Sequence, residues 1–102
     1  MSFIVRLETQ RQIVLDELVD TRDVISRLLV TRTDPAYQCI RFIDPYGDTV
    51  FNVLQMPQFL REWVELEEST PNDDAVETIR AVRALAERCR DEVHLYLRFM
   101  GD

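Results

Sequence analysis

The chain has 102 residues, the length of one globular domain. Its hydrophobic content of 46%, with two glycines and four prolines, excludes a disordered or low-complexity protein. Nineteen acids stand against twelve basic residues, all of them arginine, so the net charge of −7 argues against a surface that binds nucleic acid or anionic membranes. We therefore expect a single domain over residues 1–102 that binds neither nucleic acid nor membranes.

The N-terminus and the cysteines bear on localisation. Residues 1–10 lack the basic region and apolar core of a secretion signal, and no apolar run approaches the roughly 18 residues of a membrane span. Cys39 and Cys89 suit a reduced compartment better than a disulfide scaffold. These features predict a cytoplasmic protein.

The first third of the chain predicts a strand hairpin and a short helix. Phe3, Val5 and Leu7 alternate with other residues, and residues 13–18 resume the alternation after a polar turn, which is the period of a β-strand. Asp20 or Thr21 can then cap a helix. The buried stripe of this helix is expected to contain Val24, Ile25, Leu28 and Leu29. Residues 31–35 are expected to form a loop.

The middle of the chain predicts a second hairpin. Residues 37–44 have the strongest strand pattern, with Ile40 and Phe42 on one face, and residues 49–53 form a returning strand. Between them, residues 44–47 (Asp-Pro-Tyr-Gly) have the side chains that a β-turn favours at each position. A metal site using Asp44 and Asp48 is the alternative, but the loop lacks the ligand series of a calcium site. We predict a turn.

The last half of the chain predicts two helices and a strand. One helix begins near Met56, and another begins with a cap at residues 70–73 and runs to about Asp91. In the C-terminal segment, Leu95, Leu97 and Phe99 alternate with more polar residues, as in a strand.

The predicted order is strand, strand, helix, strand, strand, helix, helix, strand. Hairpins followed by paired helices indicate an α+β fold with one antiparallel-dominated sheet of about five strands. The helices are expected to pack on one face of this sheet.

The distribution of charge gives the first functional hypothesis. All of the net charge falls within residues 62–77, because the other twelve acids balance the twelve arginines. The acids near the end of the helix that begins near Met56 also oppose the helix dipole, which costs about 0.3–1 kcal/mol each at low salt. Solubility is the alternative explanation for this acidic segment. The seven acids are Glu62, Glu65, Glu67, Glu68, Asp73, Asp74 and Glu77.

A polar patch gives the second hypothesis. It lies on the exposed face of the sheet and could bind a ligand or a partner, although a solvated face is usual for an antiparallel sheet. The candidate residues are Arg41, Tyr46, His94, Tyr96 and Arg98.

The sequence gives little support for a catalytic nucleophile or a metal site. A nucleophilic pair of Cys39 with His94 would need adjacent strands, and two buried structural thiols are the simpler reading. His94 is the only histidine in the chain, so we expect no metal site and no cofactor.

Three hypotheses follow. In the first, a small binding protein presents the acidic segment to a basic protein partner, as a bacterial immunity protein or inhibitor would. In the second, a small enzyme or ligand-binding domain uses the patch on the sheet face. In the third, the sheet face is the interface of a homodimer.

Overall fold

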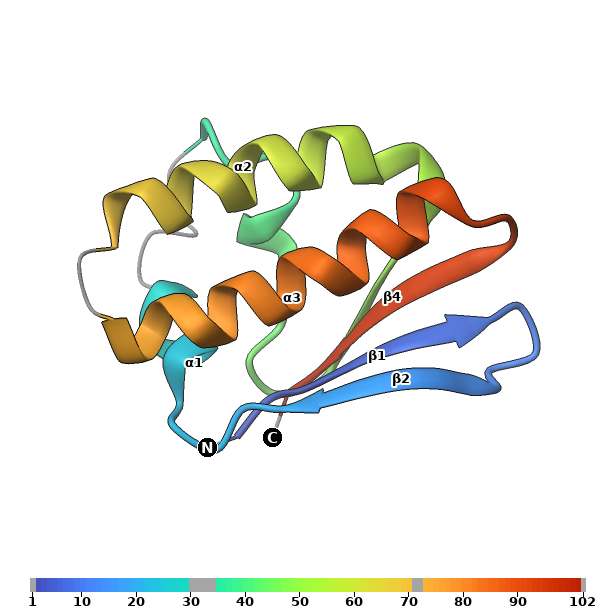
Figure 1. The fold of residues 1–102 in the computed structure, drawn as a ribbon, viewed down its shortest axis with the longest axis horizontal. Helices are drawn as coiled ribbons and strands as arrows, with labels where there is room; N and C mark the ends of the chain where they lie inside the picture. Colours follow the sequence, from blue (N-terminus) through green and yellow to red (C-terminus); the bar gives the residue numbers. More distant parts are fainter. Residues whose placement is uncertain (1, 30–34, 71–72, 102) are drawn as a thin grey trace.

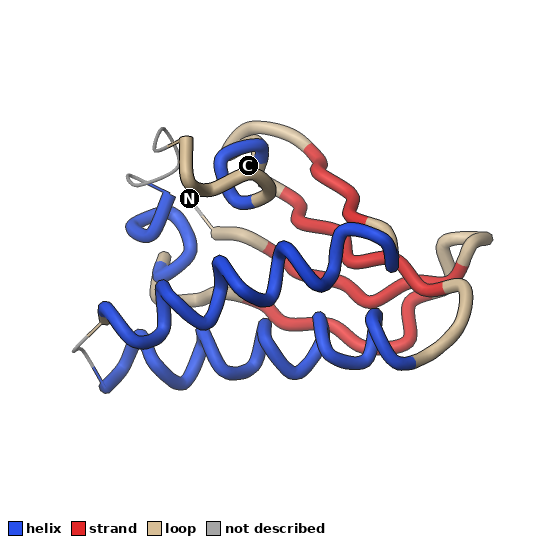
Figure 2. Tube along the Cα trace, turned by 90° about the horizontal axis from the view of Figure 1, so that it is seen from above, coloured by secondary structure: helices blue, strands red, loops and turns tan. Residues whose placement is uncertain are grey.

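The computed structural model describes residues 2–29, 35–70 and 73–101, which form one sheet with two long helices across one of its faces (Figure 1). Figure 2 shows the helices side by side along this sheet. The class is α+β with one antiparallel sheet, as predicted, but the sheet has four strands instead of five. No described helix is long and apolar enough to cross a membrane.

The strands are β1 (Ile4–Thr9), β2 (Val14–Val19), β3 (Asp48–Phe51) and β4 (Leu95–Met100). Their order across the sheet is β2-β1-β4-β3, and every neighbouring pair is antiparallel. The predicted first hairpin and C-terminal strand are therefore confirmed. β4 lies inside the sheet, between β1 and β3, although it is last in the chain.

The helices are α1 (Val24–Leu28), α2 (Met56–Ser69) and α3 (Asp73–Asp91), with short 3-10 turns η2 (Ile40–Phe42) and η3 (Val53–Gln55). Pro57 lies in the first turn of α2, as predicted. The Asp20 carboxylate accepts hydrogen bonds from the backbone N–H groups of Val24 and Ile25, so it stabilises the start of α1 as expected. The predicted loop at residues 31–35 and the cap at residues 70–73 lie largely outside the described residues.

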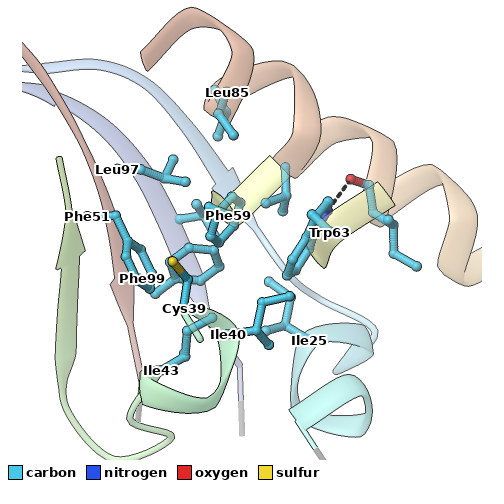
Figure 3. Close-up of a cluster of buried hydrophobic side chains, with 14 of the residues drawn as sticks. Ile25, Cys39, Ile40, Ile43, Phe51, Phe59, Trp63, Leu85, Leu97 and Phe99 are labelled. Carbon is cyan, nitrogen blue, oxygen red and sulfur yellow. Dashed lines mark hydrogen bonds between the residues drawn. The ribbon is translucent and has the colours of Figure 1, made fainter. Parts of the chain in front are cut away.

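The core lies between the sheet and the long helices (Figure 3). The Phe59 and Trp63 rings stack with centroids 5.3 Å apart, and Phe51 and Phe99 pack against Phe59 at 5.2 and 5.8 Å. The Trp63 indole N–H donates to the carbonyl of Ile79 at 2.8 Å, which joins α2 to α3. Burial of these large side chains supplies the main favourable free energy of folding.

The predicted strand at residues 37–44 is wrong, because these residues form turns and η2. The backbone N–H groups of Gln38, Cys39 and Ile40 donate to the carboxylate of Glu62 on α2, so they are not available to a strand ladder. Phe42 is 62% exposed, whereas Ile40 is fully buried, so the two do not share a face. A buried acid supplied by a distant helix overrides the local strand pattern.

The turn at residues 44–47 is confirmed, but it does not join two paired strands. The Tyr46 N–H donates to the Asp44 carboxylate at 2.9 Å, and the Gly47 N–H points to the Asp44 carbonyl at 3.5 Å. The Gly101 N–H donates to the Gly47 carbonyl at 2.7 Å, which fixes the loop against the end of β4. A Cβ atom on Gly101 would come within 2.5 Å of the Pro45 backbone, so this approach requires glycine.

Candidate functional site

Glu62 is a structural residue. It is 3% exposed, and its two carboxylate oxygens accept the three backbone hydrogen bonds from residues 38–40 at 2.8–3.2 Å. The Gln58 side-chain amide donates a further hydrogen bond at 2.6 Å. Glu62 therefore does not belong to an exposed acidic surface.

Glu67 faces α3. Its carboxylate forms ion pairs with Arg83 at 2.8 Å and Arg80 at 3.4 Å, and its side chain is 14% exposed. Two arginines from the neighbouring helix thus offset the unfavourable position of this acid at the C-terminal end of α2. Sequence spacing alone does not reveal the pairing, because the partners lie 13 and 16 residues away.

Two acids of the segment on α3, Asp74 and Glu77, lie near the end of β2. Asp74 pairs with Arg22 at 3.4 Å, and Glu77 lines a surface hollow together with Arg22 and Val19 of β2. The side chain of Asp73 lies outside what the structure describes. The described acids of the segment therefore occupy several different environments, and Glu62 is removed from the surface.

Glu65 and Glu68 are the acids of α2 that stay at the surface. Both are exposed, and neither forms an ion pair with any residue that the structure describes. They lie in the last turns of α2, which contain no basic residue in the final turn, so the dipole penalty at this helix end is not offset for them.

A groove beside these two acids has an apolar floor. Pro57, Leu60 and Val64 recur at helical spacing on α2, and Leu60 is largely covered while Pro57 is exposed. Glu68 follows Glu65 by three residues, so it continues the same helical face. The groove has a volume of about 490 Å³, and we call it the α2 groove. It is lined by Pro57, Leu60, Arg61, Val64, Glu65 and Arg90.

The outer face of the sheet, away from the helices, carries part of the predicted polar patch. Tyr96 and Arg98 of β4 lie opposite Glu8 and Arg6 of β1. The Arg98 guanidinium donates to Glu8 at 2.8 Å and to Asp48 at 3.0 Å, and the bond to Glu8 is the main cause that raises the pKa of Arg98. Arg98 is therefore neutralised by two acids.

A small hollow of about 180 Å³ lies beside this group, and we call it the sheet-face pocket. Tyr96 and Arg98 are the members that the sequence patch predicts, whereas Glu8 was missed. The pocket is lined by Glu8, Thr9, Gln10, Gln12, Val50, Tyr96 and Arg98.

The other members of the predicted patch lie elsewhere. His94 precedes β4 at a positive φ of 61° and lines a separate hollow at the tip of the β1–β2 hairpin, beside Arg11 and Ile13. Arg41 lies in η2 and stacks on Phe42, with its guanidinium carbon 4.8 Å from the ring centroid. Tyr46 is 74% exposed at the turn, as expected, but it lines neither hollow.

Both cysteines are buried, as predicted. Burial is the main cause that raises the pKa of each thiol to about 11, and for Cys39 the Glu62 carboxylate adds to the shift. The structure does not bring Cys39 to His94: Cys39 lies against Gln55, with its Sγ 4.0 Å from that carbonyl, whereas His94 is exposed beside the β1–β2 hairpin. The Cys39–His94 pair is therefore not formed.

Two features of the surface were not predicted. The α2 groove has a signal in the sequence, because Pro57 and Val64 lie at helical spacing beside Leu60, at the edge of the core stripe. Glu8 has a weaker signal, since strand alternation places it on the outer face but says nothing about its burial. Within the described ranges no group of three or more histidine, cysteine, aspartate or glutamate side chains could hold a metal ion. Comparisons with protein families, curated proteins and solved structures find no match to this chain.

Proposed function

We propose that the protein is a small protein-binding domain whose contact surface is the α2 groove together with Glu65 and Glu68. The observation that carries the proposal is the juxtaposition of an apolar groove with two exposed acids that have no ion-pair partner among the described residues. Protein interfaces combine a buried apolar centre with a polar rim in this way.

The chemistry of the surface indicates the partner. An amphipathic helix could place an apolar side chain over Leu60 and Val64, as in other helix-in-groove complexes. Basic side chains on the flank of that helix would lie against Glu65 and Glu68. The net charge of −7 would then increase the rate of encounter with a basic protein. An inhibitor of a basic enzyme, such as a bacterial immunity protein, would fit this description.

The charges of Glu65 and Glu68 favour a binding role over a role in solubility alone. Two arginines of α3 form ion pairs with Glu67. None of the described residues forms an ion pair with Glu65 or Glu68 at the same helix end. A folding requirement does not explain these two acids, because Leu66 and Trp63 supply the burial of the helix. A basic partner would offset their charge.

The test is to map where a basic amphipathic helix binds. A synthetic peptide with leucines at i and i+4 and lysines on one flank is titrated into the ¹⁵N-labelled protein. We expect saturable shifts of the amides around Leu60, Val64 and Glu68. A peptide of the same composition in scrambled order is the control, because it keeps the charge but loses the apolar face. Equal shifts with both peptides, or shifts spread over the whole surface, would refute the groove as the site.

A further inference from the structure

The outer face of the sheet has an unusual pairing of charges. Arg6 and Arg98 lie directly opposite each other on β1 and β4, which is unfavourable for like charges. Each arginine is paired with acids of a neighbouring strand. Arg6 donates to Glu17 at 2.6 Å, and Arg98 donates to Glu8 and Asp48. This face therefore carries three acids against two arginines.

Glu8 is the member of this set that points to a ligand. It is 3% exposed although it alternates along β1 with the core residue Leu7 and so lies on the outer face of the sheet. Its Oε1 atom accepts from the Arg98 Nε, but its Oε2 atom accepts no hydrogen bond from the described residues. Since Glu8 lines the sheet-face pocket, the second oxygen is left for whatever occupies that pocket. This oxygen is not among the fully buried unpartnered atoms of the described residues, so it can be reached from the pocket.

We infer that the sheet-face pocket binds a small organic cation, an alkylammonium or guanidinium group, through the second carboxylate oxygen of Glu8. The cation would donate an N–H to that oxygen, and the Tyr96 ring beside Glu8 would provide an aromatic wall that favours positive charge. The side-chain carbonyl oxygens of Gln10 and Gln12 could accept hydrogen bonds from the remaining N–H groups of the cation.

The charge and size of the pocket select this ligand class. An anionic ligand would need Arg98, but two nitrogens of its guanidinium already donate to Glu8 and Asp48. The volume of about 180 Å³ suits a single charged head group and not a large metabolite. The cation can come from a free amine or from a lysine or arginine side chain of a peptide, since the recognised group is the same.

The experiment is a ¹⁵N NMR titration of the full chain with n-propylammonium and with methylguanidinium. n-Propanol serves as a neutral probe of the same shape as the first ligand. N-acetyl-lysine amide distinguishes a side-chain source from a free amine, because it carries the cation on a peptide-like backbone. We expect saturable shifts for the amides of Thr9, Gln10, Gln12 and Tyr96 with the cations and none with the alcohol.

Two variants localise the effect. Glu8→Gln keeps an oxygen that can accept from Arg98 but removes the negative charge, and we expect it to weaken binding by about tenfold or more, as for the loss of a charge-assisted hydrogen bond. Glu17→Gln removes a carboxylate from the same face without touching the pocket, and it should bind like the parent. Unchanged binding in Glu8→Gln, equal weakening in both variants, or no saturable shift in the parent would each overturn the inference.

Discussion

Both carboxylate oxygens of Glu62 lie within hydrogen-bond distance of the Cys39 backbone nitrogen, at 3.0 and 3.2 Å. This contact joins α2 to a segment 23 residues earlier in the chain, and it places an acid inside the core. Because of this contact, residues 37–44 form turns, although their sequence pattern predicts a strand.

Replacing Glu62 with alanine should destabilise the fold strongly. The change would leave three buried or partly buried N–H groups, those of residues 38–40, without their acceptor, at a cost of roughly 1–3 kcal/mol each. We expect the free energy of unfolding in urea to fall by at least about 3 kcal/mol. Glu65→Ala, on the exposed side of the same helix, is the control and should change it by less than about 0.5 kcal/mol. Similar small losses in both variants would show that the contact with residues 38–40 is unimportant.

Gly101 should not tolerate alanine. The new Cβ would lie 2.5 Å from the Pro45 carbonyl carbon and oxygen, and backbone atoms cannot move aside cheaply. We expect a loss of about 1–3 kcal/mol, typical of overpacking, with a matching fall in the melting temperature. Gly47→Ala is the matched comparison, since its Cβ meets the flexible Asp44 carboxylate at 2.8 Å and the side chain can rotate away. If Gly47→Ala proves the more damaging change, the close approach of the loop to Gly101 is not as described.

The C-terminal strand should be indispensable. β4 pairs with β1 on one side and β3 on the other, so a chain that lacks residues 94–102 loses both ladders and the burial of Leu97 and Phe99. We expect the truncated protein to lose its cooperative thermal transition in circular dichroism. A sharp transition near the temperature of the full chain would contradict this topology.

The buried thiols should make the free energy of unfolding fall as the pH rises into the alkaline range. Burial raises the pKa of Cys89 from 9.0 to about 11, so the unfolded chain releases this proton first as the pH rises. The contribution of the protonated Cys89 thiol to the free energy of unfolding is therefore complete below pH 9 and is lost between about pH 9 and 11. No lysine titrates in this window, because the chain has none. In Cys89→Ala, the fall in urea stability over this range should be shallower than in the parent; equal slopes would contradict the assignment.

The hydrophobic pattern of the sequence predicted those helices and strands that bury one face at regular spacing. The stripe of α2 and the alternation in β4 are set by burial on one face. Three helices and four of the five predicted strands appear close to where the sequence pattern places them. The segment 37–44 failed because its conformation depends on Glu62, which lies far away in the sequence and looks like one acid among several. The different environments of the acids in residues 62–77 could not be predicted for a related reason. Charge composition does not show whether an acid faces solvent, as Glu65 does, or the arginines of a neighbouring helix, as Glu67 does.

We propose that Glu65 and Glu68 bind a basic partner beside the α2 groove. The most direct measurement is the affinity of the parent and of two charge-reversed variants for the lysine-flanked amphipathic peptide, by fluorescence anisotropy at low and physiological salt. Glu65→Arg/Glu68→Arg reverses the proposed contact. Glu87→Arg/Glu92→Arg makes the same change in net charge on α3 and the segment that follows it, outside the groove. Melting curves confirm that both variants are folded.

We predict that the Glu65→Arg/Glu68→Arg variant binds at least about tenfold more weakly than the parent and loses most of the salt dependence. The Glu87→Arg/Glu92→Arg variant should stay within about threefold of the parent, because long-range charge alone contributes little at physiological salt. An equal loss of affinity in the two variants would mean that the peptide responds to net charge and not to this surface, and it would contradict the proposed role of Glu65 and Glu68.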